Sequence, residues 1–407
     1  MEFLQNDLFS YEDYKNSIIK VCDLVRDDKP LISEVEIDEA TNRANLAFDY
    51  SFDGQSKFYP FKLNNVIKNL DFQILVITGA SGSGKSTFSK YFGNEENIIW
   101  NNNKAIISNF TSTDEAIDKL GAVGLNSIPT WCKPRNVLST GEGFRADLAR
   151  RLKSNCVIDE FTSTVDRNVA LSCSKSISSY IRKNNLQKCV FVSCHKDFID
   201  VLCPDYVIDL DDECVYDTRG LPRRKFELQI YEIKKDKYDV WKHFKQHHYL
   251  SSDLNIACKM FVAYLNNELV ACCSILPQPG VQGLKYPAWR VHRLVVLPDY
   301  QGLGIATKFV EYICDLFSYH ERVVFLRTSH HKLINYMIKS DKWTGYGKLE
   351  VSHHQSGILS HIKIKDEKRL STSFRYSAPC QNVEGRNYNA LSFKERAPEN
   401  IVVSSLF

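Results

Sequence analysis

A glycine-rich turn between an apolar strand and a helical pattern is the feature that most constrains what this chain can fold into. Residues 74–77 are apolar, and residues 79–86 follow with the spacing G-x-x-x-x-G-K-S. Glycines in such a turn let backbone N–H groups close around phosphate oxygens, because a Cβ would block the approach. The N-terminal amides of the following helix point at the same anion. A chance lysine in a glycine-rich turn is the alternative, and the flanking strand and helix disfavour it.

We therefore predict a nucleotide phosphate-binding loop in this turn. Lys85 supplies a positive charge to the β- and γ-phosphates, and the Ser86 hydroxyl is a candidate ligand of Mg²⁺. The residues predicted to contact the nucleotide are Gly79, Ser81, Gly82, Gly84, Lys85, Ser86 and Thr87.

Length and composition narrow the class of protein. The 407 residues are enough for two or three domains. No apolar run reaches the roughly 18 residues that span a bilayer, so we predict no membrane segment. The first residues lack the basic start and apolar core of a secretion signal. The 13 cysteines form no C-x-x-C pair, which indicates reduced thiols in a cytoplasmic protein, and no ligand spacing favours a zinc site.

Charge divides the chain into an acidic and a basic half. Residues 1–220 hold 25 Lys and Arg against 32 Asp and Glu, whereas residues 221–407 hold 27 against 17. Ten of the 11 histidines also follow residue 220. A basic half indicates an anionic partner, such as a nucleic acid or a phosphate-bearing cofactor. A solvated basic surface is the alternative.

Before the phosphate loop the pattern predicts an amphipathic helix within residues 1–30 and then short strands. The predicted strands are 32–37, 46–52 and 57–63, with an Asp53-Gly54 turn between the last two. Tyr50, Phe58 and Tyr59 are candidate platforms for an adenine ring. Aromatic residues are more often part of a sheet, so that alternative stays open.

Four short motifs follow the phosphate loop. The segment 138–142, Leu-Ser-Thr-Gly-Glu, precedes a helical pattern and forms a second helix terminus suited to phosphate. Asp159 and Glu160 end a buried strand, where Asp159 can hold Mg²⁺ and Glu160 can polarise an attacking water. Residues 163–166 come next, and a further apolar strand ends in His195. A lone histidine is more often structural, but its place after this strand favours a role near the γ-phosphate.

In order and identity these motifs resemble those of the ABC-type ATPases over residues 30–215. The resemblance implies a P-loop α/β domain that dimerises head to tail. ATP would lie between Lys85 of one subunit and residues 138–142, the signature segment, of the other. It also implies that Glu160 and His195 act in hydrolysis. The further nucleotide contacts that it implies are Ser139, Gly141, Glu142 and Asp166.

Two departures from the ABC pattern matter. Thr140 and Glu142 stand where the family most often has Gly and Gln, and no Gln lies between Lys85 and Leu138. The family's glutamine loop, which couples ATP state to a membrane partner in transporters, is therefore missing, with Asn109 as a weak substitute. This chain thus resembles the soluble, non-transport branch of the family.

A second domain is predicted after a linker at 219–225. An alternating strand at 226–233 precedes a helix at 241–248 and a hairpin of two strands, 257–265 and 268–276. A β-branched strand then leads into Gln301-Gly302-Leu303-Gly304-Ile305-Ala306, which opens a helix ending near Phe317. This is again a strand, a glycine turn and a helix N-terminus, and it suits a diphosphate. The third glycine of a dinucleotide-binding fingerprint is absent.

With the preceding strand, this turn resembles motif A of the GNAT N-acetyltransferases. The resemblance covers about 226–365 and implies an α+β fold that binds acetyl-CoA. Its pyrophosphate would lie on residues 301–306, and its pantetheine arm would pair with the backbone of Leu294, Val295 and Val296. Tyr336 occupies the place of the tyrosine that protonates the leaving thiolate in many members.

The catalytic base of the transferase has several candidates. An amine must lose a proton before it attacks a thioester, so a His near the cofactor strand is favoured. His292 lies on that strand, and strand alternation predicts that it and Arg293 point to opposite faces. Ser329, His330 and His331 follow the next strand, and the cluster 247–249 could line a substrate groove; all could equally be structural or exposed.

The predicted organisation has five parts: an N-terminal helical segment, an ABC-type ATPase domain, a linker, a GNAT-like domain and a polar, irregular tail that helps to bind an anion. Their bounds are 1–30, 31–218, 219–225, 226–365 and 366–407.

The order of the two domains resembles a small prokaryotic and viral family of ABC-type ATPases fused to an acetyltransferase. The second half also resembles acyltransferases that modify bases in phage DNA, through the regions of Tyr249 and Arg293. These resemblances imply an ATP-dependent N-acyltransferase that uses acetyl-CoA on DNA or tRNA and forms an ATP-dependent homodimer. Two alternatives stay open: an ATP-gated acetyltransferase of proteins or small molecules, and a nucleic-acid clamp ATPase whose GNAT-like domain only binds.

Overall fold

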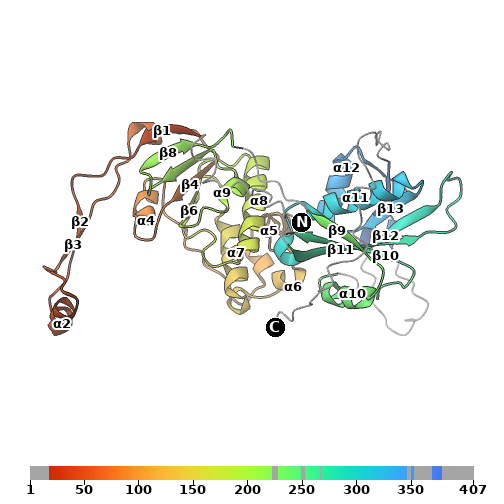
Figure 1. Cartoon of the computed structure of the whole chain (residues 1–407), viewed down its shortest axis with the longest axis horizontal. Coiled ribbons are helices and arrows are strands. Elements are labelled where there is room, and N and C mark those ends of the chain that lie inside the picture. The colour runs from red at the N-terminus through yellow and green to blue at the C-terminus, as the bar shows by residue number, and fades with distance from the viewer. Residues whose placement is uncertain are drawn as a thin grey trace, which may run out of the picture. The chain divides into compact units, whose positions relative to one another are not determined.

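The chain forms two compact units that divide between Lys225 and Phe226 (Figure 1). A computed structural model describes residues 18–221, 228–248, 253–265, 267–345, 350–352 and 369–377. Most of the predicted linker, the first 17 residues and residues 378–407 lie outside the described residues. The second unit thus begins where the sequence predicts the start of the second domain.

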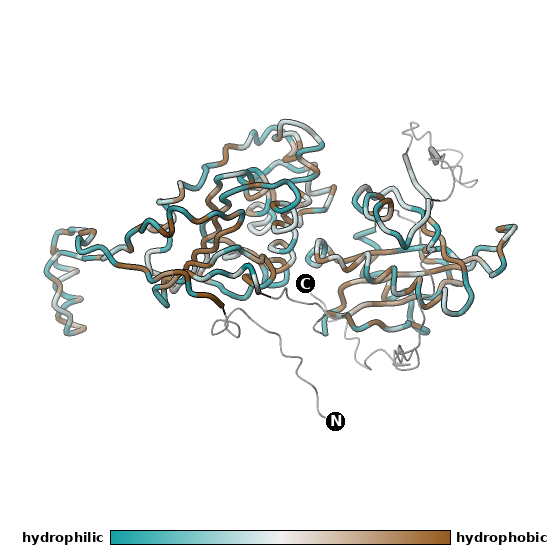
Figure 2. The backbone as a smooth tube through the Cα atoms, turned by 90° about the horizontal axis from the view of Figure 1, so that it is seen from above, coloured by the Kyte–Doolittle hydropathy of each residue, from teal (hydrophilic) through white to brown (hydrophobic). Residues whose placement is uncertain are grey.

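A six-stranded sheet, ordered β1-β8-β7-β4-β6-β5, forms the centre of the first unit. β4 to β7 run parallel, and β8 and β1 extend the β7 edge as antiparallel strands. β4 and β6 are buried over their whole length, as expected for parallel strands covered on both faces. Figure 2 colours the backbone by hydropathy and shows hydrophobic segments, in brown, running through this unit. The strands are β1 (Ile19–Asp23), β4 (Ile74–Thr78), β5 (Val157–Ile158), β6 (Cys189–Ser193), β7 (Tyr206–Asp209) and β8 (Cys214–Asp217).

Helices cover both faces of this sheet. Ile74 and Val76 of β4 pack against α5, α7 and α8, whereas Leu75 and Ile77 pack on the opposite face with Phe88 of α4. The helices are α3 (Asn65–Lys68), α4 (Lys85–Ser89), η2 (Ile106–Asn109), α5 (Thr113–Ala122), α6 (Ile128–Trp131), η3 (Arg135–Val137), α7 (Thr140–Arg151), α8 (Arg167–Lys183) and α9 (Ile199–Leu202).

An arm at residues 31–58 extends from the first unit (Figure 1). It consists of β2 (Leu31–Glu34), α2 (Glu39–Phe48) and β3 (Gln55–Phe58). Among the described strands, β2 and β3 pair only with each other. The predicted strand at 46–52 is wrong in its first part, because α2 extends to Phe48. The Asp38 side chain caps α2 by accepting a hydrogen bond from the backbone N–H of Thr41, a helix start that the alternating residues after Leu46 obscured.

The predicted N-terminal helix is also wrong over residues 19–23. These residues form β1, an edge strand that pairs with β8 almost 200 positions later. Pairing with a distant strand overrides a helical periodicity that local sequence alone suggests.

The second unit is built on an eight-stranded sheet in the order β14-β16-β13-β12-β11-β10-β9, with β15 paired to β16. Phe309 and Ile313 of α11 pack on one face of this sheet, and Trp241 and Phe244 of α10 pack on the other. The elements are β9 (Gln229–Ile233), α10 (Lys237–Lys245), β10 (Lys259–Leu265), β11 (Glu268–Pro277), β12 (Ala288–Val296), η4 (Pro298–Tyr300), α11 (Ile305–Tyr319), β13 (Val323–Thr328), α12 (His331–Lys339), β14 (Trp343–Gly345), β15 (Glu350–Ser352) and β16 (Arg369–Tyr376).

The predicted irregular tail is wrong at its start. Residues 369–376 form β16, which lies between β13 and β14 and buries Phe374 and Tyr376 in the core. Arg and Ser occupy every second position of this strand and give it little apolar character. The segment is therefore difficult to recognise as a strand from its sequence. The rest of the predicted tail lies outside the described residues.

Candidate functional site

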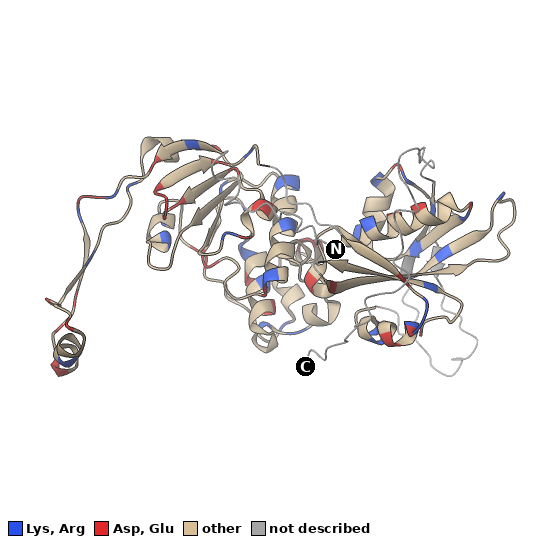
Figure 3. Ribbon diagram, viewed as in Figure 1, with Lys and Arg blue, Asp and Glu red and all other residues tan. Residues whose placement is uncertain are grey.

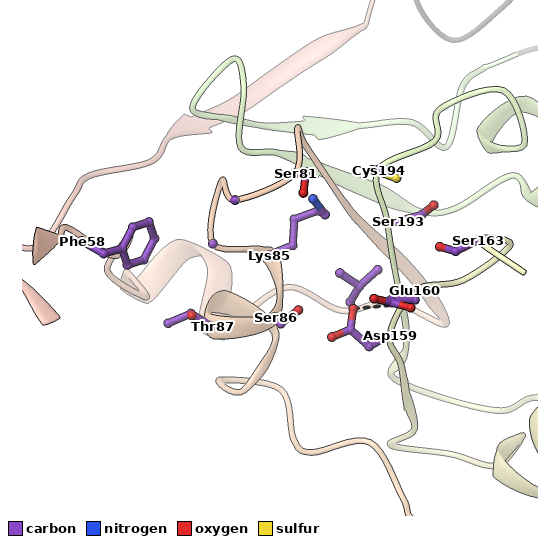
Figure 4. Close-up of a pocket in the computed structure, with 13 residues that line it drawn as sticks. Phe58, Ser81, Lys85, Ser86, Thr87, Asp159, Glu160, Ser163, Ser193 and Cys194 are labelled. Carbon is purple, nitrogen blue, oxygen red and sulfur yellow. Dashed lines mark hydrogen bonds between the residues drawn. The ribbon is translucent and has the colours of Figure 1, made fainter. Parts of the chain in front are cut away.

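A cleft of about 400 Å³ lies at one edge of the first sheet (Figure 4). β4, β5 and β6 are parallel neighbours, so the segments that follow them meet at their carboxyl ends. The residues lining the cleft are Phe58, Ser81, Gly82, Gly84, Lys85, Ser86, Thr87, Asp159, Glu160, Ser163, Val192, Ser193 and Cys194.

The glycine turn has the backbone that a phosphate-binding loop needs. Gly82 and Gly84 have φ values of 79° and 95°, in the left-handed region that favours glycine. A Cβ on Gly84 would also lie 2.4 Å from Cζ of Phe58, so a larger residue here would require the ring to move. Phe58 is therefore the one aromatic candidate among Tyr50, Phe58 and Tyr59 that lines the cleft.

Lys85 lines the cleft, and no acidic side chain among the described residues forms a salt bridge with it. Its Nζ donates to the carbonyl oxygens of Gly79 and Ala80 at 2.8 and 2.6 Å. The hydroxyl oxygen of Ser83 in the same turn is buried and hydrogen-bonds to none of the described residues. A cation and an unsatisfied hydroxyl on a glycine turn fit a phosphate group.

Two carboxylates face this turn from the end of β5 (Figure 4). The backbone N–H of Glu160 donates to Oδ1 of Asp159 at 2.9 Å, and Glu160 has a left-handed φ of 49°. A non-glycine residue held in this conformation is strained, and such strain is common at functional sites. Ser86 and Asp159 line the same cleft with oxygen atoms of the kind that Mg²⁺ prefers.

Glu95 supports this acidic pair, although no motif in the sequence points to it. Its Oε1 accepts a hydrogen bond from the backbone N–H of Asp159 at 3.1 Å and lies 3.0 Å from Arg151 Nη1. Burial raises the pKa of Glu95, against the opposing effect of the Arg151 charge. The contact joins positions 64 residues apart, so no local pattern could have revealed it.

Cys194, rather than His195, lines the cleft at the end of β6. Ser193 and Cys194 are both among the lining residues. The backbone N–H of His195 donates to the Ser193 hydroxyl at 3.1 Å. Asn109, the weak substitute for the missing glutamine, is committed to its own loop, where its side chain accepts from Asn101 and donates to Ala105.

The signature segment lies outside the Lys85 cleft. Ser139 caps α7, and the Glu142 carboxylate accepts hydrogen bonds from Ser139 N–H at 3.1 Å and from the Thr130 hydroxyl at 3.0 Å. Burial opposes the charge of Glu142, but these bonds lower its pKa overall. The position of a Cβ on Gly141 is 3.6 Å from Val165, next to Asp166, which caps α8.

In the second unit, β12 separates from β13 partway along its length. The parallel pairing covers only Ala288–Arg290 against Val323–Phe325. Leu294, Val295 and Val296 pair with β11 on one side and have no ladder with β13 on the other. Their backbone groups on that side can therefore pair with an extended amide ligand, as the sequence predicts for pantetheine.

The turn after β12 presents backbone amides rather than side chains. Gly302 and Gly304 have φ values of 96° and 82°, and a Cβ on Gly304 would meet no atom within 4 Å. Leu303 and Ile305 are buried in the core, and Ala306 packs at its edge. The Gln301 side chain donates to the carbonyl of Val296 at 2.9 Å and so holds the turn against the end of β12.

His292 is the extra residue of a β-bulge, which overturns the prediction that it and Arg293 point to opposite faces. Ser274 pairs with Arg293 and Ile275 with Val291, so the ladder skips His292. Arg293 Nη1 lies 3.5 Å from His292 Nδ1, and both side chains reach the segment 253–255.

His292 is a weak base in this setting. Burial and the charges of Arg293 and Arg290 lower its pKa to about 4. Its Nε2 accepts a 3.4 Å hydrogen bond from the backbone N–H of Asn255. The imidazole is therefore neutral at neutral pH but has a low proton affinity.

Tyr336 is held by a buried carboxylate. Its hydroxyl donates to Oε1 of Glu311 at 2.6 Å, and Lys342 Nζ and Trp343 Nε1 donate to the same carboxylate at 3.0 and 3.3 Å. Only 2% of Glu311 is exposed. Burial and the Glu311 hydrogen bond raise the pKa of Tyr336 to about 12.

The other predicted candidates for the catalytic base are His330, His331 and the cluster at 247–249. His330 caps α12, its Nδ1 accepting from the backbone N–H of Leu333 at 3.4 Å. The side chain of His331 and all of Tyr249 lie outside the described residues. Burial lowers the pKa of His247, which lies beside His243.

Residues 227–337 match the acetyltransferase (GNAT) family. This match supports an acetyltransferase domain in the second unit and leaves the first unit without a family assignment. No curated protein matches the chain. Among the described residues, no helix combines the length and apolar character needed to cross a membrane.

Solved acetyltransferases also align with part of the chain. Arabidopsis thaliana Naa50, in complex with a bisubstrate analogue, has 14% identity and a TM-score of 0.29 over 37% of this chain and 98% of its own. The ribosomal-protein-S18-alanine N-acetyltransferase of Escherichia coli has 12% identity and a TM-score of 0.28 over 37% and 93%. Arabidopsis thaliana NAA60, with acetyl-CoA, has 13% identity and a TM-score of 0.28 over 37% and 98%.

Proposed function

We propose that the chain is an ATP-dependent N-acyltransferase whose second unit transfers acetyl from acetyl-CoA to an amine of a nucleic acid. The GNAT family match over residues 227–337 carries the transferase part. The separation of β12 from β13 and the open turn at Gly304 support it, because they offer backbone partners for an amide chain and for a diphosphate.

In the proposed reaction the amine nitrogen bonds to the thioester carbonyl carbon while the C–S bond breaks. The amine loses one proton, and the sulfur gains one. Acetyl-CoA supplies the activated acyl group. The neutral His292 can accept the amine proton only weakly, and Tyr336 must leave Glu311 before it can donate to the sulfur.

We further propose that the first unit is an ABC-type ATPase. The cleft supports this, because it joins Lys85, Ser86, Asp159 and Glu160 at one sheet edge. Lys85 would hold the phosphates of ATP, and Ser86 and Asp159 would hold Mg²⁺. Bound Mg²⁺-ATP supplies a phosphoanhydride bond that can be hydrolysed, and Glu160 would accept a proton from water.

A homodimer that forms with ATP belongs to this proposal. The predicted contacts in the signature segment and at Asp166 do not line the Lys85 cleft of their own chain. They could reach a nucleotide there only from a second copy.

A nucleic acid is the proposed acceptor because of charge. Residues 221–407 hold 27 Lys and Arg against 17 Asp and Glu, which favours a polyanion over a neutral or basic acceptor.

The second candidate function is a nucleic-acid-binding ATPase whose acetyltransferase domain does not react. One observation favours it: the Tyr336 hydroxyl is committed to Glu311, and the pKa of Tyr336 is raised to about 12. A hydroxyl so reluctant to lose its proton is a poor general acid.

The deciding experiment measures acetyl-CoA consumption by purified chain, with and without ATP, against DNA, tRNA and a lysine-rich protein. Lys85→Ala is the test variant. Lys90→Ala is its matched control, because Lys90 is exposed and follows α4 outside the cleft.

Consumption that requires a nucleic acid and ATP, and that is lost in Lys85→Ala alone, would support the proposal. Acetyl-CoA consumption with the lysine-rich protein alone would show that the acceptor is a protein instead of a nucleic acid. ATP hydrolysis without acetyl-CoA consumption on any acceptor would leave the second candidate.

A further inference from the structure

The arm at residues 31–58 exposes large apolar side chains that no described part of the first unit covers. α2 has no buried residue. Leu46, Phe48 and Tyr50 are 86%, 82% and 64% exposed. We define the arm surface as Leu31, Ile32, Val35, Leu46, Phe48 and Tyr50, all of which are exposed.

Exposure of this kind indicates a docking surface. Single exposed apolar residues are ordinary, but several large ones on one extending element mark an interaction site. Each large side chain contributes about 1.5–3 kcal/mol when it is fully buried, so a partner that covers three of them gains substantially.

The charge of the arm restricts the partner. The arm carries six Asp and Glu residues and only Arg43 and Lys57 as basic ones (Figure 3). A net charge of −4 repels a nucleic acid and favours a protein surface with basic residues around an apolar centre. Residues 221–407 of this same chain have the required excess of Lys and Arg.

The root of the arm is fixed at the nucleotide cleft. Phe58, the last residue of β3, lies against Gly84 and lines the Lys85 cleft. Beyond it, Arg26 pairs with Phe61 in a β-bridge and donates to the Glu213 carboxylate at 2.8 Å. The arm therefore leaves the first unit from the rim of the cleft that the proposed dimer would close.

We propose that the arm surface docks on a second copy of this chain, on the basic residues of its second unit. The inference rests on the proposed function only for the location of the dimer face. The contact itself uses apolar burial and charge, so it forms without nucleotide and keeps two copies together, whereas ATP would close the two first units on each other in the proposed dimer. Because the two copies are identical, each arm would dock on the other copy in a two-fold arrangement.

The first test measures molar mass by light scattering across protein concentration, without nucleotide. The test variant is Leu46→Gln with Phe48→Gln, and Asn42→Gln, an exposed polar position on the same helix, is its control. We expect dimers for the wild type and the control, and a dissociation constant at least about tenfold higher for the test variant with unchanged circular dichroism.

The second test identifies the contact. A benzophenone amino acid in place of Phe48 is irradiated in a mixture of ¹⁴N- and ¹⁵N-labelled chains. Crosslinks between differently labelled chains, from the arm to residues after 226, would support the proposal. Crosslinks only within one chain would overturn it in favour of docking on the chain's own second unit.

Other results of these tests also decide whether the arm contact exists. A monomeric wild type at all concentrations, or unlimited association that the double variant does not weaken, would overturn the proposal. The variant Lys85→Ala separates the arm contact from the proposed ATP-dependent function. Arm-dependent dimers that persist in this variant would support the arm contact even if the chain fails to bind ATP.

Discussion

The two units share one backbone arrangement but surround it with different side chains. In each, a strand ends in a turn with left-handed glycines that opens a helix: β4, Gly84 and α4 in the first unit, β12, Gly304 and α11 in the second. The first turn adds Lys85 and meets carboxylates that follow β5, which β6 separates from β4 in the sheet. The second adds buried side chains at positions 303 and 305, so that mainly its backbone faces outward.

This difference separates recognition by charge from recognition by shape. A turn with a lysine and two acids can bind a metal-bound phosphate and act on it. A turn of bare amides can only bind and position its ligand. We therefore expect substitutions in the first unit to remove binding outright and those in the second to weaken it.

The largest expected effect is that of Lys85→Ala on nucleotide binding. Removing one partner of a buried charge contact costs about 2–5 kcal/mol of binding free energy. We expect titration with a fluorescent ATP analogue to show this loss, with acetyl-CoA affinity unchanged. Equal affinity for the analogue in Lys85→Ala and Lys90→Ala would refute the assignment of the cleft.

Next in size is the effect of Glu311→Gln on the second unit. The substitution removes the charge that three donors share, and we expect a loss of about 1–3 kcal/mol in unfolding free energy. It should also lower the pKa of Tyr336 from about 12 part of the way to 10, because burial still raises it.

Denaturant unfolding and ultraviolet titration of tyrosine measure these two changes. Glu321→Gln, at an exposed position after α11, is the control and should change neither. A Tyr336 pKa that stays at about 12 in Glu311→Gln would show that Glu311 does not control the hydroxyl.

A smaller effect is expected for Gly304→Ala, with Gly280→Ala as a matched control. The two glycines have φ values of 82° and 87°, and a Cβ meets no atom within 4 Å at either. Both variants should lose about 1 kcal/mol of stability from the left-handed backbone. Only Gly304→Ala should weaken acetyl-CoA binding, by about tenfold in calorimetry, because its Cβ blocks the turn.

The smallest effect concerns pH. The pKa of His292 is about 4 in the folded chain and close to its ordinary value of 6.5 when unfolded. The unfolded chain therefore binds a proton as pH falls below 6.5 while folded His292 stays neutral, so stability decreases between pH 6.5 and 4. Denaturant midpoints at pH 7.5 and 6 should differ less in His292→Gln than in the wild type, and an identical difference would contradict the lowered pKa.

Most of what could be predicted about both turns follows from residues that are close together in the sequence. The glycines at 82, 84, 302 and 304 predict left-handed backbone, which their φ values confirm. The apolar runs before them predict strands, which β4 and β12 confirm. Each of these signals lies within about ten residues, so no knowledge of tertiary contacts is needed.

Long-range contacts explain what could not be predicted. Phe58 packs against Gly84, the Glu95 side chain accepts a hydrogen bond from the backbone of Asp159, and β1 pairs with β8. Each contact joins residues that are distant in the sequence. The bulge at His292 depends on how β11 pairs with β12, which alternation alone cannot show. The prediction of a strand at 46–52 is wrong in its first part because the start of α2 depends on one side-chain cap at Asp38, which is a weak signal in the sequence.

The insertion of β16 between β13 and β14 bears on the order in which the chain can fold during synthesis. The sheet of the first unit is complete once β8 at residues 214–217 has emerged from the ribosome. The sheet of the second unit lacks an internal strand until residue 376 has emerged. Since domains fold as they are synthesised, the nascent chain carries a finished first unit while β13 still has an unpaired edge, and that edge is the place where nascent chains would associate wrongly.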